Sequence, residues 1–300
     1  MKVATLLHNP GAGDEAHSKD VLIRLIETEG YTCHYVPVKE SGMDAVHPES
    51  QLIIIAGGDG TVRKVAKQLL LTDALDRPVP MAVLPLGTAN NIARAMGFHT
   101  NPEETIRAWR TAEIKTVDIW EIDQLPGARF FAEGMGFGVF PMLIEEMKKH
   151  DEELSDEPEE RIKKAIEKEL EIVRSYQPFH CKIEADGRDL SGDYLLVELM
   201  NITSIGPNLH LAPDADAADR MADIVLLGDE HRAELIRYLE NKLRGIEERF
   251  PFPTTKACRI LLDCDTQFVH VDDELISLHE PREIMISSEG RKLQLLYARS

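Results

Sequence analysis

The sequence predicts an α/β protein with a doubly wound N-terminal domain followed by a β-rich, sandwich-like second domain. Before residue 100, short apolar segments alternate with segments of helical periodicity, the pattern of parallel strands joined by crossover helices. After Ile114, the apolar segments follow one another through Gly or Asp turns without helices between them. A chain of 300 residues, 43% hydrophobic and 29% charged, is long enough for two cores. We expect a first domain at 1–115 and a second at 116–283, with 284–300 as a segment that can return to the first.

The first domain is expected to contain four strands and four helices. Its clearest strand is Leu52–Ile55, because Ile53, Ile54 and Ile55 form an apolar β-branched run without polar alternation, typical of a strand covered on both faces. Asn101-Pro102 is a start signal for a helix. The other strands are expected at Val3–Leu7, Thr32–Val36 and Met81–Leu84, and the helices near Ser18–Glu29, Val62–Leu71, Asn91–Met96 and Glu103–Arg110.

The second domain is expected to consist of strands with one helical insertion at 142–176. Within the insertion, apolar residues recur at helical spacing among Glu and Lys, which predicts two amphipathic helices with one solvated face each. A second role for them, as a mobile cover over a lipid cleft, stays open. Asp186-Gly187 is a hairpin signal. Strands are expected at Thr116–Ile122, Arg129–Ala132, His180–Glu184 and Tyr194–Met200.

The net charge of −19 argues against nucleic acid and against electrostatic adhesion to anionic lipid, because both need a cationic surface. Contact with a membrane would be transient at most. No apolar run reaches the length of a spanning helix and Met1–Leu7 lacks the features of a signal peptide, so we expect a cytoplasmic protein, with a homodimer as an open possibility. The cysteines lack metal-ligand spacing, so we expect reduced thiols at Cys33, Cys181, Cys258 and Cys264.

Three loops rich in glycine and small polar residues follow predicted strands of the first domain. They are Asn9 to Gly13 (NPGAG), Gly57 to Thr61 (GGDGT) and Pro85 to Asn91 (PLGTANN). Glycine amides and a helix N-terminus favour an anion, so a phosphate could bind there, and Asp59 could hold Mg2+ or bind a ligand hydroxyl. The alternative is a tight strand-to-helix turn, as in any α/β domain. None of the loops is a Walker A sequence, because none ends in Gly-Lys-Ser/Thr.

A run of carboxylates in the second domain, within Phe268 to Ile276 (FVHVDDELI), is the other candidate for chemistry. If this segment is one strand, Asp272 and Glu274 point to the same face, where one carboxylate can raise the pKa of the other and suit it to act as a general base. The alternative from the residues alone is a polar hairpin turn.

In order and spacing, NPGAG, GGDGT and PLGTANN resemble the nucleotide-binding loops of the diacylglycerol kinase catalytic family, which includes sphingosine and ceramide kinases and shares a fold with NAD kinases and 6-phosphofructokinases. The resemblance implies ATP and Mg2+ as cofactors and a lipid alcohol as acceptor. It implies Asp272 as general base, Glu274 as its support and Asp59 as a residue that helps to hold Mg2+ and phosphates. The nucleotide-binding residues implied are Asn9, Gly13, Gly57, Gly58, Asp59, Gly60, Thr61, Gly87, Thr88 and Asn90. The segment Glu133 to Gly138 (EGMGFG) resembles the part of the family that lines the acceptor cleft.

The segment from Asn201 to Asp223 also resembles the family, whose bacterial members hold a structural Mg2+ there through an Asp and main-chain carbonyls. Carried over, this metal would touch Asp219 and the carbonyls of Asp216 and Met221. Arg220 stands where the family usually has Gly. An ordinary acidic loop is the alternative.

Three functions therefore stay open. The first is an ATP-dependent lipid kinase acting on diacylglycerol or a related lipid. The second is a kinase of a soluble acceptor such as NAD. The third is a diverged nucleotide-binding or regulatory protein without kinase activity, because Asn91, Arg220 and Asp273 depart from the family pattern.

Overall fold

The computed structural model describes residues 2–12, 17–38, 45–71, 79–98, 101–150, 157–280, 282–288 and 292–297. The chain divides into two compact units. The first comprises Met1–Val117 and Lys292–Ser300, and the second comprises Asp118–Arg291.

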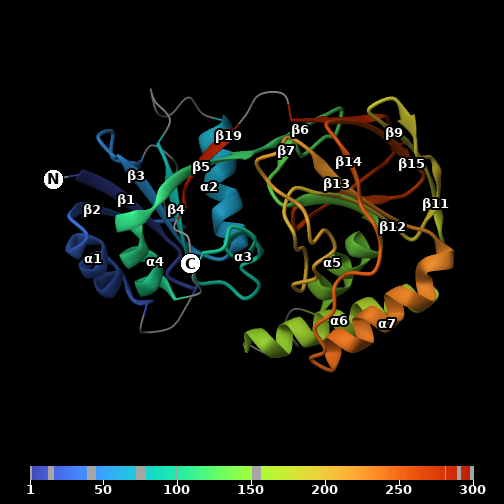
Figure 1. Cartoon of the computed structure of the whole chain (residues 1–300), viewed down its shortest axis with the longest axis horizontal. Helices are drawn as coiled ribbons and strands as arrows, with labels where there is room; N and C mark the ends of the chain where they lie inside the picture. The colour runs from blue at the N-terminus through green and yellow to red at the C-terminus, as the bar shows by residue number, and fades with distance from the viewer. Residues whose placement is uncertain are drawn as a thin grey trace. The chain divides into compact units, whose positions relative to one another are not determined.

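The first unit is built on one sheet of six strands in the order β2-β1-β3-β4-β19-β5 (Figure 1). The strands are β1 (Lys2–His8), β2 (Tyr31–Pro37), β3 (Leu52–Gly57), β4 (Met81–Pro85), β5 (Glu113–Asp118) and β19 (Lys292–Tyr297). The pairs β1/β2, β1/β3, β3/β4 and β4/β19 are all parallel. Every residue of β3 is buried, as the apolar run in its sequence predicts.

Among the described residues of this unit, four helices cover the sheet. They are α1 (Lys19–Thr28), α2 (Asp59–Leu71), α3 (Asn91–Ala95) and α4 (Pro102–Ala108), and the turn η3 (Trp109–Thr111) follows α4. The chain crosses through α1 from β1 to β2 and through α2 from β3 to β4, in opposite directions along the sheet. Right-handed crossovers in opposite directions place α1 and α2 on opposite faces. The direction reverses between β1 and β3, which is the position where open α/β sheets bind ligands.

The second unit contains two antiparallel sheets. In one, the order is β10-β9-β15-β18-β6-β7, with β11 paired to β9; in the other, it is β14-β13-β12-β8-β16-β17. The strands are β6 (Trp120–Asp123), β7 (Phe130–Phe131), β8 (Gly134–Gly138), β9 (Phe179–Ala185), β10 (Arg188–Asp189), β11 (Gly192–Tyr194), β12 (Leu196–Met200), β13 (Ala222–Leu227), β14 (Thr255–Ala257), β15 (Arg259–Cys264), β16 (Phe268–Val271), β17 (Glu274–Ser277) and β18 (Ile284–Ser287).

One hydrophobic core lies between these two sheets, with Trp120 and Ile183 from the first and Phe137 and Val197 from the second. A second core joins the outer face of the β12/β13 sheet to α5 (Val139–Lys149), α6 (Pro158–Ser175) and α7 (Arg232–Leu243), which gather on one side of this unit in Figure 1. The short turn η5 (Asp229–His231) precedes α7. The predicted doubly wound domain and sandwich-like second domain are confirmed.

Three predicted elements differ from the structure. The expected strand Tyr194–Met200 covers parts of two strands, because Tyr194 ends β11, which pairs with β9, whereas Leu196–Met200 forms β12 in the other sheet. The expected strand Thr116–Ile122 is two strands, β5 and β6, because the chain leaves the sheet of the first unit and enters a sheet of the second around Ile119. The segment expected to return to the first domain begins at 284, but β18 pairs with β15 and β6 in the second unit, and the first unit resumes at Lys292. The hairpin signal at Asp186-Gly187 is confirmed, with φ of +50° and +76° at the two turn residues.

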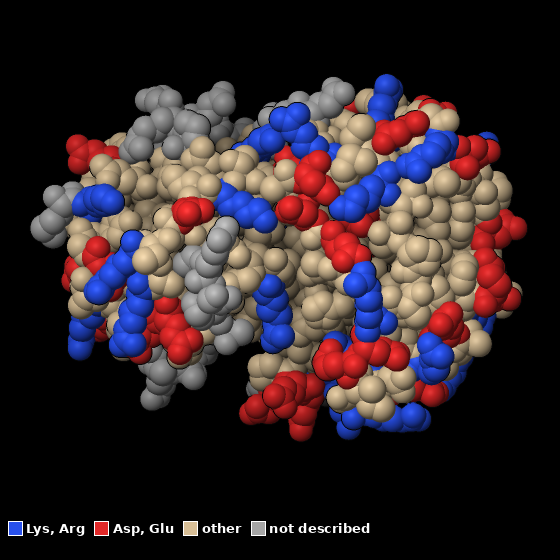
Figure 2. Space-filling view, viewed as in Figure 1, with Lys and Arg blue, Asp and Glu red and all other residues tan. Residues whose placement is uncertain are grey.

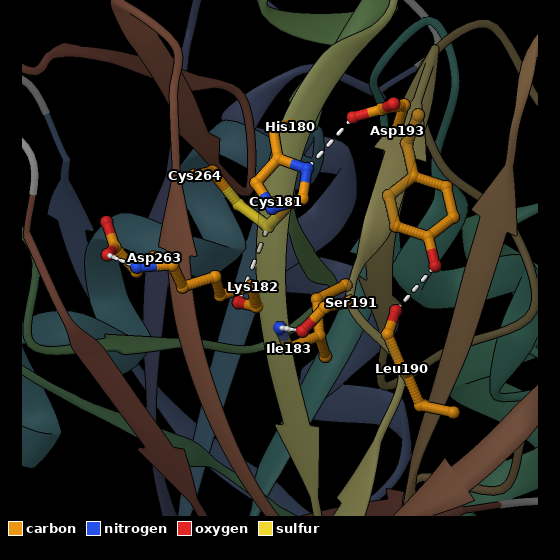
Figure 3. Close-up of a disulfide and its surroundings, with 10 residues drawn as sticks. His180, Cys181, Lys182, Ile183, Leu190, Ser191, Asp193, Asp263 and Cys264 are labelled. Carbon is orange, nitrogen blue, oxygen red and sulfur yellow. Dashed lines mark hydrogen bonds and ion pairs between the residues drawn. A yellow bond between two sulfur atoms is a disulfide. The ribbon is translucent and has the colours of Figure 1, made fainter.

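The expectation of four reduced cysteines is wrong for one pair. Cys181 of β9 and Cys264 of β15 face each other directly in the sheet and form a disulfide, with 4.0 Å between their Cα atoms (Figure 3). Their separation of 83 residues hides this pairing in the sequence, because only the strand register brings them together. Cys33 and Cys258 are not part of a disulfide.

The surface drawn in Figure 2 carries basic side chains among acidic ones, without a continuous basic patch among the coloured residues. Within the described ranges, no helix combines the length and the hydropathy required to span a bilayer.

Candidate functional site

The three glycine-containing loops lie side by side at the carboxyl edge of the first sheet, because they follow the neighbouring strands β1, β3 and β4. The amide of Asn9 donates to the carbonyl of Ala56 at 2.9 Å, and the amide of Leu86 donates to the carbonyl of Gly57 at 3.0 Å. These bonds continue the ladder of the sheet into the loops. The strand order therefore brings together the segments that the sequence analysis singles out.

Gly58 and Gly87 form the closest contact between two of these loops. A Cβ atom on Gly87 would lie 2.4 Å from the Cα atom of Gly58, and a Cβ atom on Gly58 would lie 2.9 Å from the Cα atom of Gly87. Only glycine at both positions permits this backbone approach. Gly57 makes room for the side chain of Thr61 in the same way, since its Cβ atom would lie 2.5 Å from Thr61 Oγ1.

The carboxylate of Asp59 bridges the second loop to the third. Its Oδ2 accepts a hydrogen bond from the amide of Asn91 at 2.9 Å, and its Oδ1 accepts one from the amide of Ile92 at 3.1 Å. These amides open α3, and the residue at its N-cap, Asn90, gives α3 no side-chain cap. Asp59, 32 residues earlier in the chain, therefore supplies the cap from another helix.

Asn90 closes the third loop on itself. Its backbone is left-handed, with φ of +52°, and its side-chain amide accepts from the Gly87 amide at 2.9 Å and donates to the Gly87 carbonyl at 2.8 Å. Gly60 and Thr88 are exposed. In the first loop, the side chain of Asn9 accepts a hydrogen bond from the amide of Gly11, which stabilises the turn there. Gly13 lies outside the described residues.

Asp272 of the second unit lies in a two-residue turn between β16 and β17, so the continuous strand is wrong and the hairpin alternative is right. Its Oδ1 accepts hydrogen bonds from three consecutive amides, those of Ala132, Glu133 and Gly134, at 3.2, 2.8 and 3.3 Å. Its own amide donates to the carbonyl of Gly134 at 2.7 Å. Amide donors of this kind stabilise the charged carboxylate and fix its position.

Glu274 and the segment Glu133 to Gly138 are the other features expected in this part of the site. Glu274 is exposed at the start of β17, one residue beyond the turn. Glu133 to Gly138 contains β8 and two of the three amides that hold Asp272, those of Glu133 and Gly134. Asn201 secures this segment, since its side chain donates to the carbonyl of Ala132 at 2.8 Å and its amide donates to the carbonyl of Glu133 at 2.9 Å.

The loop expected to hold a structural Mg2+ does not fit a metal ion, because an ammonium group already lies among its oxygens. Lys256 Nζ lies 2.6 Å from Asp219 Oδ2, 3.4 Å from Asp223 Oδ2 and 3.5 Å from the Asp214 carbonyl. The carbonyl of Asp216 accepts from the amide of Asp219. Burial lowers the pKa of Lys256, but Asp219 and Asp223 raise it above its ordinary value, so the amine stays charged. Met221 donates its amide to Asp219 Oδ1. Within the described ranges, no group of three or more His, Cys, Asp or Glu residues could hold a metal.

From this arrangement we expect the free energy of unfolding, measured without nucleotide, to be the same in Mg2+ and in excess EDTA. The Lys256→Met variant should lose about 2 kcal/mol, because the fully buried carboxylate of Asp223 then lacks its cation. Mg2+ should restore part of that loss in the variant alone. Chemical denaturation in the two buffers measures all four values, and a wild-type protein stabilised by Mg2+ would contradict the assignment.

Three buried ionisable side chains near the Asp272 turn were missed by the sequence analysis: Glu169, Glu198 and His270. The signal was present in each case. Glu198 and His270 interrupt apolar strands, and Glu169 stands three residues after Ile166 and four before Val173, on the apolar stripe of its helix.

Known proteins resemble the chain over both units. The family model of the diacylglycerol kinase catalytic domain matches residues 3–122, and that of the YegS C-terminal NAD kinase beta sandwich-like domain matches residues 163–289. The diacylglycerol kinase of Bacillus subtilis (strain 168) is 30% identical over 260 residues, which cover 82% of this chain and 80% of that protein.

Solved structures share the fold of the whole chain. A diacylglycerol kinase from Bacillus anthracis str. Sterne superposes with a TM-score of 0.72 at 22% identity, covering 99% of this chain and 96% of that one. An NAD kinase from Archaeoglobus fulgidus, solved in complex with ATP, gives a TM-score of 0.55 at 12% identity, with coverage of 99% and 94%. At these identities the likeness shows a common fold, and the first unit is NAD kinase-like.

Proposed function

Because the chain belongs to the diacylglycerol kinase catalytic domain family, a family of lipid kinases, we propose that it transfers the γ-phosphoryl group of ATP to a hydroxyl of diacylglycerol or a related lipid. The observation that carries the proposal is the carboxylate of Asp272, which three amides hold in place on a turn beside β8. A fixed carboxylate is the group required to take a proton from an alcohol.

The loops of the first unit form the proposed nucleotide site. The loop after β3 offers glycine backbone at Gly58 and Gly60 and the amides that open α2, and no Cβ atom lies between Gly58 and Gly87 where they approach each other. Such backbone is suited to bind phosphate oxygens. Asp59 is the carboxylate that we propose to contact Mg2+ carried by ATP, and that ion would neutralise charge on the phosphates. The same carboxylate caps α3. A ligand bound by Asp59 would therefore be held in a fixed position relative to the third loop.

In the proposed reaction, the lipid hydroxyl oxygen forms a bond to the γ-phosphorus while the bond from that phosphorus to the bridging oxygen of ADP breaks. The hydroxyl proton passes to the carboxylate of Asp272, at Oδ2, since Oδ1 is the oxygen that accepts from the three amides. The chain contributes position and charge, and makes no covalent bond to the phosphoryl group. Glu274, at the start of β17, is proposed to support the same turn.

A phosphotransfer screen tests this function. Pure protein is incubated with labelled ATP and Mg2+ and, separately, with diacylglycerol, a sphingoid base, ceramide and NAD. Label in one of the lipids supports the proposal. Label in NAD alone would show a kinase of a soluble acceptor, and label in none of them, with ATP bound, would favour a nucleotide-binding protein without transfer activity.

Two substitutions of Asp59 separate its two roles. Asp59→Ala should lose about 1 kcal/mol of stability with the cap of α3 and should also weaken Mg-ATP binding. Asp59→Asn keeps an acceptor oxygen for one of the two amides, so it should retain most of the stability while binding Mg-ATP more weakly. Thermal denaturation and calorimetric titration measure the two effects, and an unchanged dissociation constant in both variants would count against this loop as the nucleotide site.

A further inference from the structure

Two buried ionisable residues meet across the middle of the β12/β8/β16 sheet. Glu198 of β12 and His270 of β16 both lie opposite Gly136 of β8, and their side chains are 0% and 1% exposed. A Cβ atom on Gly136 would lie 2.0 Å from Glu198 Oε2. The glycine therefore leaves the space through which the carboxylate of Glu198 reaches the imidazole of His270.

The imidazole of His270 joins Glu198 to the turn that carries Asp272. Its Nε2 lies 2.8 Å and 2.9 Å from the two carboxylate oxygens of Glu198, and its Nδ1 lies 2.7 Å from the carbonyl oxygen of Asp272. A carbonyl oxygen only accepts, so Nδ1 must carry a hydrogen and donate. The tautomer is thereby fixed, and Nε2 and Glu198 share the remaining proton.

The charge of Glu198 strengthens this link. Burial by itself would lower the pKa of His270, but the nearby carboxylate of Glu198 raises it above the ordinary value of 6.5. This attraction favours a proton on both nitrogens, and a doubly protonated ring makes a charge-assisted bond to the Asp272 carbonyl. The imidazole also packs against the ring of Phe140 from α5 in a T-shaped arrangement, with 6.0 Å between the ring centroids.

The turn needs such support because its backbone is unfavourable. Asp272 has φ of +56°, a left-handed conformation that costs on the order of 1 kcal/mol for a residue with a Cβ atom. Its carboxylate and its amide are bound by the segment 132–134, and its carbonyl is bound by His270. Each polar group of the residue thus has a partner that opposes rotation of the turn.

We propose that Glu198 and His270 are positioning residues that hold the carboxylate of Asp272 in its reactive place through a buried chain of hydrogen bonds. This inference rests on the proposed role of Asp272 as the general base. Neither residue touches a substrate, so loosening the chain should lower kcat and leave KM for ATP unchanged, because the nucleotide loops belong to the first unit.

The test compares two substitutions of His270. His270→Phe fills the ring volume and removes both hydrogen bonds, and it should lower kcat by about 10- to 100-fold. His270→Asn keeps a side-chain N–H near the position of Nδ1, from which it can donate to the Asp272 carbonyl, so it should recover most of that loss. Glu198→Gln, which can donate to Nε2 in place of sharing a proton, is a third variant that preserves the shape of the site.

A double-mutant cycle separates this proposal from the proposed function. If His270 acts through Asp272, His270→Phe should add little loss to an Asp272→Asn variant. An inactive Asp272→Asn together with a fully active His270→Phe would overturn the positioning role alone. A fully active Asp272→Asn would overturn the proposed base.

Hydrogen exchange at the amides of Glu133 and Asp272 tests the positioning without any substrate. Both amides are bonded within the turn, so His270→Phe should speed their exchange at least 10-fold and His270→Asn should restore much of the protection. Protection unchanged in His270→Phe would show that the turn holds its position without the buried chain, and the proposal would fail whatever the activity of the protein.

Discussion

The Asp272→Asn variant is expected to lose phosphotransfer by about 10²- to 10⁴-fold while keeping its fold and its affinity for ATP. Asparagine has the same shape and retains Oδ1, which can still accept from the amides of Ala132, Glu133 and Gly134. Its amide nitrogen replaces Oδ2 and cannot take a proton from an alcohol. The change thus removes the proposed base and preserves the turn.

The matched control is Asp273→Asn, which removes one carboxylate from the same two-residue turn at an exposed position. Its activity should stay within a factor of about two of the wild type, because surface substitutions of this kind change little. Initial rates at saturating ATP and a calorimetric titration with ATP compare the three proteins. Equal losses in both variants would point to the net charge of the turn, and full activity in Asp272→Asn would remove this residue from the mechanism.

The first unit was open to prediction because its signals are local. Ile53–Ile55 is a strand covered on both faces from its sequence alone, and the loops after β1, β3 and β4 are recognised by their glycines. Parallel strand order then places consecutive loops at one edge. The bond from Asp59 to the amides that open α3 was not foreseeable, because it joins residues 32 and 33 positions apart through the geometry of two helix starts.

The second unit was harder because its contacts depend on strand register. Cys181 and Cys264 are 83 residues apart, and nothing in either segment indicates the pairing that β9 and β15 impose. Lys256 likewise reaches Asp219 from a strand 37 positions later in the chain, so the sequence analysis weighed a metal against an empty acidic loop and did not consider an internal cation.

The same register explains why the buried network escaped notice. Glu198 and His270 are 72 residues apart and meet only because both face Gly136. Two acidic residues could nevertheless have been recognised from the sequence, because each stands where the pattern predicts an apolar residue. Glu198 lies inside an apolar strand, and Glu169 lies on the apolar stripe of α6. A buried acidic residue lowers the stability of a fold, and such residues occur where they serve another purpose.

Glu169 of α6 makes that loss of stability measurable. Burial, followed by the charge of Glu198, raises its pKa from 4.5 to about 8. The side chain is 2% exposed, and its Oε2 has no hydrogen-bond partner among the described residues. The titratable side chains of Glu198 and Tyr238 interact electrostatically with Glu169, and Glu198 is in turn hydrogen-bonded to His270. Between pH 4.5 and 8 the folded protein therefore holds a proton on Glu169 that the unfolded chain has released.

This difference in bound protons fixes the sign of the pH dependence. With one proton more in the folded state, the free energy of unfolding falls by roughly 1 kcal/mol for each unit of pH between about 4.5 and 8, and the loss is complete above 8. Glu169→Gln cannot ionise, so it should match the wild type near pH 5 and exceed its stability by on the order of 4 kcal/mol at pH 9. Urea denaturation across this range measures the difference between the two proteins.

The control for this prediction is Glu171→Gln, two residues later on the same helix. Glu171 is exposed and pairs with Lys168 at 2.8 Å, so its loss should change stability by less than about 1 kcal/mol at every pH. The wild type and Glu169→Gln share every titrating group except Glu169, so a pH-dependent difference between these two proteins reports on Glu169. A Glu169→Gln curve parallel to that of the wild type would mean that this carboxyl ionises in the folded protein near its ordinary pKa, with a partner or a path to water that offsets its burial.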